Sequence, residues 1–202
     1  MIKPDREMRQ MRAVASKFST RKDGDNLHIE GYLSVFNSNY EIAPGLSESF
    51  APGAFSNTLS RDIRALVNHD TTLVLGRNKA NTLGLREDSR GLFGDITINP
   101  NDSDAMNLYA RVERGDVDQC SIGFDIIKED TDFREDGSIH WTIREVVLYE
   151  VSCCTFPAYE ETSIACRTKQ AEEIKKRNSE AWKLKTMNRL KGENNGTQNI
   201  NA

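Results

Sequence analysis

Short alternating stretches of apolar and polar residues fill the chain up to about residue 166. Successive side chains of a strand point to opposite faces, so this period of two predicts β-structure. We predict strands at residues 13–19, 28–35, 63–67, 73–75, 82–87, 92–98, 119–127 and 139–154. Gly76, Gly84 and Gly91 separate three of them. The main body of the protein is therefore predicted to be mostly β.

Helical patterns are confined to a few segments. Residues 101–114 repeat apolar side chains every three positions, begin with polar N-cap residues and end before Gly115, as a capped helix does. A shorter helix is predicted at residues 53–59. Charged turns are predicted at residues 21–26 and 129–136.

The composition changes near residue 167. Residues 167–202 contain nine Lys and Arg against four Glu, a balance of +5, while the whole chain carries −4, which leaves −9 for residues 1–166. This acidic body argues against nucleic acid as a partner. Apolar residues in the tail recur at helical spacing up to Gly192, which predicts a basic amphipathic helix followed by a disordered end.

These patterns divide the chain into a flexible lead-in (1–12), a folded domain (13–166) and a helical tail (167–202). The start lacks the apolar segment of a secretory signal, and no stretch approaches the roughly 18 apolar residues that span a membrane. The four cysteines include no C-x-x-C pair, so they predict neither a zinc site nor a disulfide framework. We expect reduced thiols in a cytoplasm, and no metal or cofactor.

Three histidines are available as a general base. His28 falls on the polar side of its predicted strand, which is a solvated position. His69 ends the strand at 63–67 and precedes turn-forming residues 70–72, so a rigid element holds it while a substrate can still reach it. Pattern alone leaves His69 equally compatible with a general base and with a surface turn.

Ser121 is a candidate nucleophile on the strand at 119–127. It shares the less apolar face with Gly123 and Asp125, and the glycine leaves space for a second backbone to approach. The same pattern also describes an ordinary half-exposed strand, and a serine needs a positioned base to react. The chain has no G-x-S-x-G motif, which argues against an α/β-hydrolase.

Glu150 lies in a strand with apolar residues on both faces, so its carboxylate is predicted to be buried and to need a partner. One possible partner is a histidine that the carboxylate orients. The other is an arginine such as Arg144 or Arg111. Glu145 is a weaker candidate because it lies nearer the polar start of the strand.

Eight short blocks follow one another between about residues 11 and 166, at residues 31–36, 50–55, 68–70, 76–77, 91–92, 114–117, 121–124, and 150–152 with 157–159. In this order they resemble the prohead proteases of HK97-type phages. Each block is short, but eight in the correct order are a specific pattern. Many relatives have methionine where this chain has Cys120.

This resemblance implies a serine endopeptidase with a compact, barrel-like, mostly β core flanked by helices, related in fold to the herpesvirus assemblins. His69 and Ser121 match the family's histidine and serine, and Glu150 matches its acidic residue. Assemblins use a second histidine in the third position, which makes His140 a rival. The implied mechanism is acyl transfer, in which Ser121 attacks a peptide carbonyl and His69 takes its proton.

The resemblance also implies the partners: the major capsid protein with its N-terminal scaffolding segment, any separate scaffold, and the protease itself, inside the assembling prohead in the host cytoplasm. Self-association is compatible with the sequence. The basic tail suits encapsulation or self-removal, and equally a plain helix. Two alternatives stay open: a non-catalytic capsid-assembly or scaffolding protein that keeps the fold, and a thiol peptidase using Cys120. Strand alternation places Cys120 opposite Ser121, so both cannot face His69.

Overall fold

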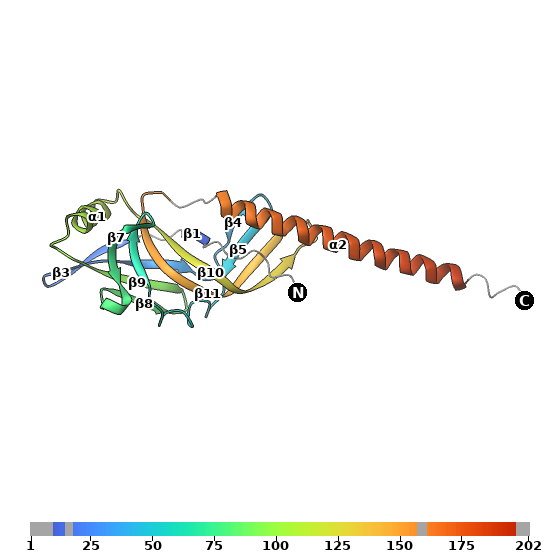
Figure 1. Ribbon diagram of the computed structural model, residues 1–202, viewed down its shortest axis with the longest axis horizontal. Helices are drawn as coiled ribbons and strands as arrows, with labels where there is room; N and C mark the ends of the chain where they lie inside the picture. Colours follow the sequence, from blue (N-terminus) through green and yellow to red (C-terminus); the bar gives the residue numbers. More distant parts are fainter. Residues whose placement is uncertain (1–9, 15–17, 157–160, 197–202) are drawn as a thin grey trace, which may run out of the picture. The chain divides into compact units, whose positions relative to one another are not determined.

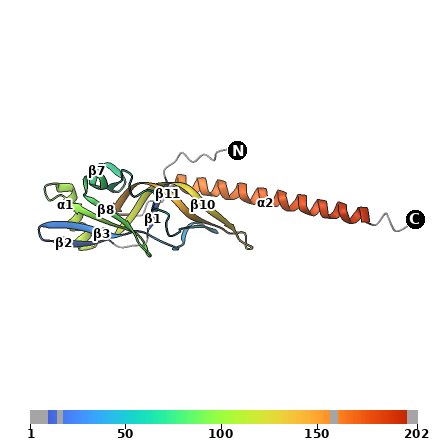
Figure 2. The same cartoon turned by 90° about the horizontal axis from the view of Figure 1, so that it is seen from below.

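The computed structural model describes residues 10–14, 18–156 and 161–196. The chain divides into two compact units, Met1–Ile164 and Ala165–Ala202. The described part of the first unit is mostly β with a helix, α1, and that of the second is helical (Figures 1 and 2). The predicted class, mostly β with helices, is confirmed.

The strands of the first unit form two sheets. The seven-stranded sheet has the order β1 (Gln10–Val14), β10 (Gln119–Phe133), β11 (Ile139–Cys154), β5 (Leu46–Phe50), β4 (Tyr40–Ala43), with β6 (Arg64–Val67) paired to both β11 and β7 (Asp70–Arg77). The four-stranded sheet has the order β2 (Ser19–Asp23), β3 (Asn26–Val35), β9 (Gly91–Ile98), β8 (Leu83–Glu87). Among the described strands neither sheet closes on itself, so the core is an open two-sheet structure and not a closed barrel.

The antiparallel hairpin of β10 and β11 organises the larger sheet (Figure 1). The start of β11, residues 139–143, pairs in parallel with β5, and its end, residues 150–153, pairs in parallel with β6. The residues of β11 are mostly buried, as its apolar pattern on both faces predicts. Two short strands from earlier in the chain are thereby fixed at opposite ends of one long strand.

Helix α1 (Ser103–Arg114) begins and ends where its capping residues predict. The carboxylate of Asp102 accepts hydrogen bonds from the amides of Asp104 and Ala105, and Gly115 has a left-handed φ of 87°. The helix contacts β2 and β9. A short 3-10 helix, η1 (Asn78–Ala80), lies between β7 and β8.

Four local predictions are wrong. Residues 53–59 form successive turns and no helix, because Gly53 has a left-handed φ of 90° and the amides bond only three residues back. Residues 10–12, assigned to the lead-in, belong to β1, and residues 21–23 extend β2. Residues 129–133 continue β10, since pairing with β11 outweighs their charged composition. The rest of the predicted lead-in, residues 1–9, lies outside the described residues.

Helix α2 (Glu161–Gly196) begins four residues before the second unit and continues through it. It runs past the predicted end at Gly192, and the predicted boundary at residue 167 falls inside it. Its exposed side chains Trp182 and Leu184 are two positions apart, about 200° around a helix, so they do not share one apolar stripe. Of the ten final residues predicted to be disordered, 193–196 belong to α2, which corrects that prediction, and 197–202 lie outside the described residues. None of the helices in the described ranges is long and apolar enough to cross a membrane.

Candidate functional site

His69 lies in the tight turn that joins β6 to β7. The turn consists of Asn68 and His69, whose φ angles are 48° and 62°. Left-handed φ at both central positions matches the twist of a two-residue hairpin, and asparagine suits the first position. Glycine is the usual residue at the second position, so the conformation of His69 needs support from its surroundings.

That support comes from the end of β11. The amide of Asn68 donates to the carbonyl of Cys153 at 3.0 Å, and the amide of His69 donates to Ser152 Oγ at 3.2 Å. Asn68 Oδ1 in turn accepts from the amide of Thr155 at 2.9 Å. The turn is therefore bonded to the neighbouring strand through both of its residues.

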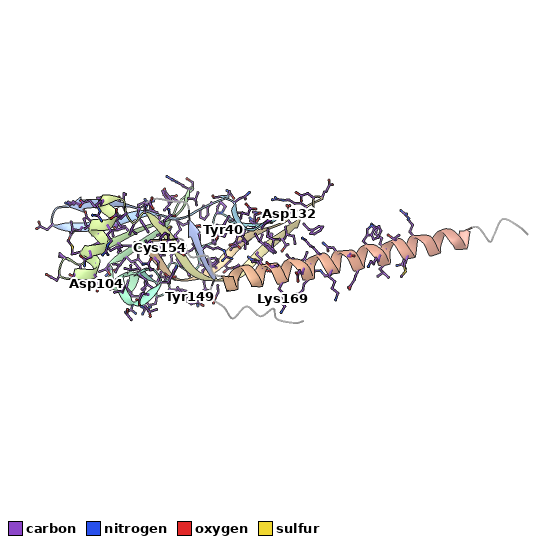
Figure 3. The ribbon with its side chains drawn as sticks, turned by 90° about the horizontal axis from the view of Figure 1, so that it is seen from above. Tyr40, Asp104, Asp132, Tyr149, Cys154 and Lys169 are labelled. Carbon is purple, nitrogen blue, oxygen red and sulfur yellow. The ribbon has the colours of Figure 1, made fainter. Side chains whose placement is uncertain are left out.

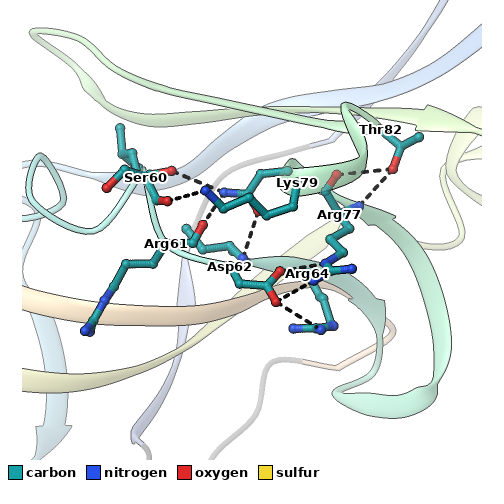
Figure 4. Close-up of polar contacts among 10 residues, drawn as sticks. Ser60, Arg61, Asp62, Arg64, Arg77, Lys79 and Thr82 are labelled. Carbon is teal, nitrogen blue, oxygen red and sulfur yellow. Dashed lines mark hydrogen bonds and ion pairs between the residues drawn. The ribbon is translucent and has the colours of Figure 1, made fainter.

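An exposed polar cluster fixes the other end of the same hairpin (Figure 4). Asp62 accepts two hydrogen bonds from Arg77, each of 2.7 Å, and one from Arg64 at 3.2 Å. The hydrogen bond from Arg77 lowers the pKa of Asp62. Lys79 Nζ donates to the carbonyl of Ser60 at 2.7 Å. Exposed ion pairs contribute little stability, so the cluster's main effect is to orient the two strands.

The imidazole of His69 binds the carboxylate of Glu150. Nδ1 lies 2.7 Å from Oε1, and the second oxygen, Oε2, accepts from Ser152 Oγ at 2.6 Å. Glu150 is only 3% exposed, so both oxygens of a buried carboxylate are satisfied. A proton on Nδ1 leaves Nε2 free to accept another. The predicted alternative partner Arg144 instead binds Asp130 at 2.8 Å.

Gly123 provides the space that the Glu150 side chain occupies. The two residues are directly paired across β10 and β11, and a Cβ at position 123 would lie 2.3 Å from Glu150 Oε1. The sequence pattern indicated that this glycine admits a close neighbour. The neighbour in the structure is a carboxylate and not a second backbone.

Ser121 is on the same face of the sheet. It is paired with Ser152 on β11 and with Ala13 on β1, and directly paired residues share a face. Its side chain is fully buried, which corrects the predicted half-exposed position. The reason is that β10 is an interior strand, flanked by β11 and by the unexpected β1. The Ser121 hydroxyl makes no hydrogen bond within the described part of the chain.

The cysteine beside His69 is Cys154 and not the predicted rival, Cys120. Cys154 Sγ lies 3.8 Å from His69 Nε2 (Cys154 is labelled in Figure 3). Burial, with a further contribution from the charge of Glu150, raises the pKa of Cys154 to about 12, so it is a neutral thiol at physiological pH. Cys120 is fully buried with its Sγ 3.5 Å from the carbonyl of Tyr32.

His140, the rival third residue, lies at the other end of β11 from Glu150. Its Nδ1 bonds Ser47 Oγ at 2.8 Å and its Nε2 bonds Ser49 Oγ at 2.9 Å, and burial lowers its pKa. The structure thus brings Glu150 to His69 and leaves His140 apart. Glu145 bonds Lys128 and Asn57.

Ser152 and Cys154 were missed by the sequence analysis. A period of two counted from Glu150 places both on the face of Glu150, so strand alternation alone could have indicated them. What the pattern did not show was the turn that brings His69 against that face.

Ser121 and Glu150 share one face of the sheet, and His69, from the adjoining turn, binds Glu150. A serine, a histidine and a carboxylate are the groups of a serine hydrolase site. The model of the Caudovirus prohead serine protease family matches residues 16–177, and the chain belongs to this family. The prohead protease of Enterobacteria phage HK97 is 35% identical over 147 residues, which cover 71% of this chain and 61% of that protein. The solved capsid assembly protease of bacteriophage T4 matches 72% of this chain and 98% of its own length, with 9% identity and a TM-score of 0.43.

Proposed function

We propose that the protein is a serine endopeptidase of prohead maturation, with Ser121 as nucleophile, His69 as general base and Glu150 as the orienting acid. The 2.7 Å contact between His69 Nδ1 and Glu150 Oε1, on the face that also carries Ser121, is the observation that supports this most. Family membership agrees with the activity.

The geometry suits acyl transfer. Glu150 accepts a hydrogen bond from the Nδ1–H of His69 and so fixes the tautomer in which Nε2 is a base. Nε2 takes the proton of Ser121 as Oγ attacks the peptide carbonyl, and then returns that proton to the departing amine. Water then attacks the acyl ester while Nε2 takes its proton. That proton passes to Ser121 Oγ as the acyl group leaves as a carboxylic acid.

We propose as substrates the N-terminal scaffolding segment of the major capsid protein, any separate scaffold, and the protease itself. Cleavage would then occur inside the assembling prohead in the host cytoplasm. The tail at 167–202 has the charge expected of an encapsulation segment or of a segment removed by self-cleavage.

One observation favours a second candidate, a non-catalytic capsid-assembly protein that keeps the protease fold. Ser121 is fully buried and its hydroxyl has no hydrogen bond in the described structure, whereas a working nucleophile must meet both its base and its substrate.

Co-expression with the cognate capsid protein separates the two candidates. Intact masses of both proteins are compared for wild type, Ser121→Ala, His69→Ala and the control Ser34→Ala, which removes a buried serine hydroxyl from β3. A peptidase gives shortened capsid protein with wild type and Ser34→Ala, and full-length capsid protein with the other two. Unshortened capsid protein in all four samples would support the assembly protein.

A further inference from the structure

The hydroxyl of Ser152 is both a hydrogen-bond donor and a hydrogen-bond acceptor. Its proton goes to Glu150 Oε2 at 2.6 Å, and its oxygen accepts the amide of His69 at 3.2 Å. The side chain is 1% exposed, so water does not replace either bond. One hydroxyl therefore joins the acid to the backbone of the histidine that this acid binds.

Each of these bonds has a distinct physical effect. The bond to Oε2 holds the carboxylate plane so that Oε1 meets Nδ1, and it withdraws negative charge from the oxygen facing the imidazole. The bond from the His69 amide holds a non-glycine residue in the left-handed region, a conformation that residues with a Cβ adopt uncommonly.

From these contacts we propose that Ser152 is a positioning residue, which sets both the orientation of the His69–Glu150 pair and the ease with which His69 takes a proton. This inference rests on the proposed function of the same site. It assigns Ser152 no contact with substrate.

Four strands lie around His69, and not all of them carry a charged side chain there. On β11 Cys154 is a neutral thiol, and Glu150 carries the charge that His69 meets. On β7 the carboxylate of Asp70 is bonded to Thr72, which lowers the pKa of Asp70. On β6 Arg64 is paired with Glu150 in register, but its guanidinium binds Asp62. The paired segment of β10, Ser121 to Gly123, is uncharged.

The sign of the expected change follows from the hydrogen bond to Oε2. In Ser152→Ala the carboxylate loses a donor and keeps more of its charge toward Nδ1, which stabilises the imidazolium. His69 therefore holds its proton to higher pH. We expect the midpoint of its titration to rise relative to wild type.

The experiment is an NMR titration of the three histidine rings in the full chain, with His28 and His140 as internal references. Wild type is compared with Ser152→Ala, with Ser152→Cys, which keeps the size but donates weakly, and with Thr58→Val. Thr58 Oγ1 accepts the amide of Leu148 on the same strand, so Thr58→Val removes a buried hydroxyl and one backbone bond of β11 away from His69. Cleavage of the capsid protein is measured in parallel.

An upward shift confined to His69 in both Ser152 variants, absent from Thr58→Val, supports the inference, and cleavage should fall by about tenfold, a part of what a positioned base contributes. An unchanged His69 midpoint in the Ser152 variants overturns it, even where cleavage falls. Because the titration needs no turnover, a shift in the Ser152 variants together with a wild-type chain that cleaves nothing would refute the proposed function and leave the role of Ser152 intact.

Discussion

Gly123 and Glu150 face each other across the β10–β11 ladder with no room for a further carbon atom. A Cβ on residue 123 would stand 2.3 Å from Glu150 Oε1 and 3.1 Å from its Cγ and Cδ. The clashing atoms belong to a side chain that can rotate, so the fold can survive the intrusion. The carboxylate cannot keep its place beside His69.

Gly123→Ala is therefore expected to reduce activity far more than stability. We expect cleavage to fall by about a hundredfold or more, because the base loses its orienting partner, while the free energy of unfolding changes by only about 1 kcal/mol. Cleavage assays and urea unfolding measure the two effects. Gly84→Ala on β8 is the matched control, since a Cβ there meets atoms only at the ordinary distances of 3.7 and 3.8 Å. Full activity of Gly123→Ala would remove Glu150 from the mechanism.

The left-handed turn before β7 gives a second test. Asn68→Ala places alanine, which tolerates a left-handed backbone less well than asparagine, at a φ of 48° and removes the bond to the Thr155 amide. We therefore expect a loss of about 1–2 kcal/mol in the free energy of unfolding together with reduced cleavage. Asn81→Ala imposes the same backbone strain, at φ 58°, outside the site. It should lower stability with cleavage unchanged, and equal loss of cleavage in the two variants would contradict a specific role for the turn.

A buried ion pair ties β1 to β5. Arg12 and Glu48 are bonded to each other with side chains 3% and 1% exposed. Removing Arg12 takes a bonded cation away from the buried carboxylate of Glu48, so Arg12→Met is expected to cost about 3–5 kcal/mol, and adding Glu48→Leu should recover much of that loss. Urea unfolding of both single variants and the double variant measures the coupling. Additive losses would show that the pair does not act as a unit.

Alkaline pH should destabilise the protein through its buried thiols. Burial raises the pKa of Cys153, and that of Cys154 to about 12, so the folded state keeps protons that the unfolded thiols release from about pH 9. The free energy of unfolding that the two protonated thiols contribute is fully present below about pH 9. It is lost progressively toward pH 12, by about 1.4 kcal/mol per pH unit for each thiol. Urea unfolding from pH 7 to 11 should give a shallower decline for Cys154→Ala than for wild type. Parallel curves would rule out this origin.

Local pattern predicted the elements whose neighbours reinforce it. The last strand, residues 139–154, has the predicted bounds, because apolar residues on both faces suit a strand that is covered on both sides. The capping residues at both ends of α1 were likewise predicted from the sequence. Strand segments that depend on distant partners were not predicted. Residues 10–12 of β1 and the charged outer part of β10 are ordered by cross-strand pairing, which no local window contains.

For the candidate site, alternation correctly separated Ser121 from Cys120, and burial correctly required a partner for Glu150. The identity of that partner is a matter of register. Pairing of β6 with residues 150–153 places the turn at His69 next to the end of β11. This pairing cannot be predicted from the sequence of either segment alone. The same dependence hid the full burial of Ser121, since the strand on its outer side comes from the start of the chain.

Strand β1 also has a consequence for access to the sheet. An edge offers one row of amides and carbonyls, and residues 10–14 already occupy the row of β10 that runs past Ser121. Any extended peptide that pairs with β10 on this side must compete with a strand tethered to the same molecule. A tethered segment acts at an effective concentration of the order of millimolar. Another peptide displaces it only where the local concentration of that peptide, as well as its affinity for β10, is high enough.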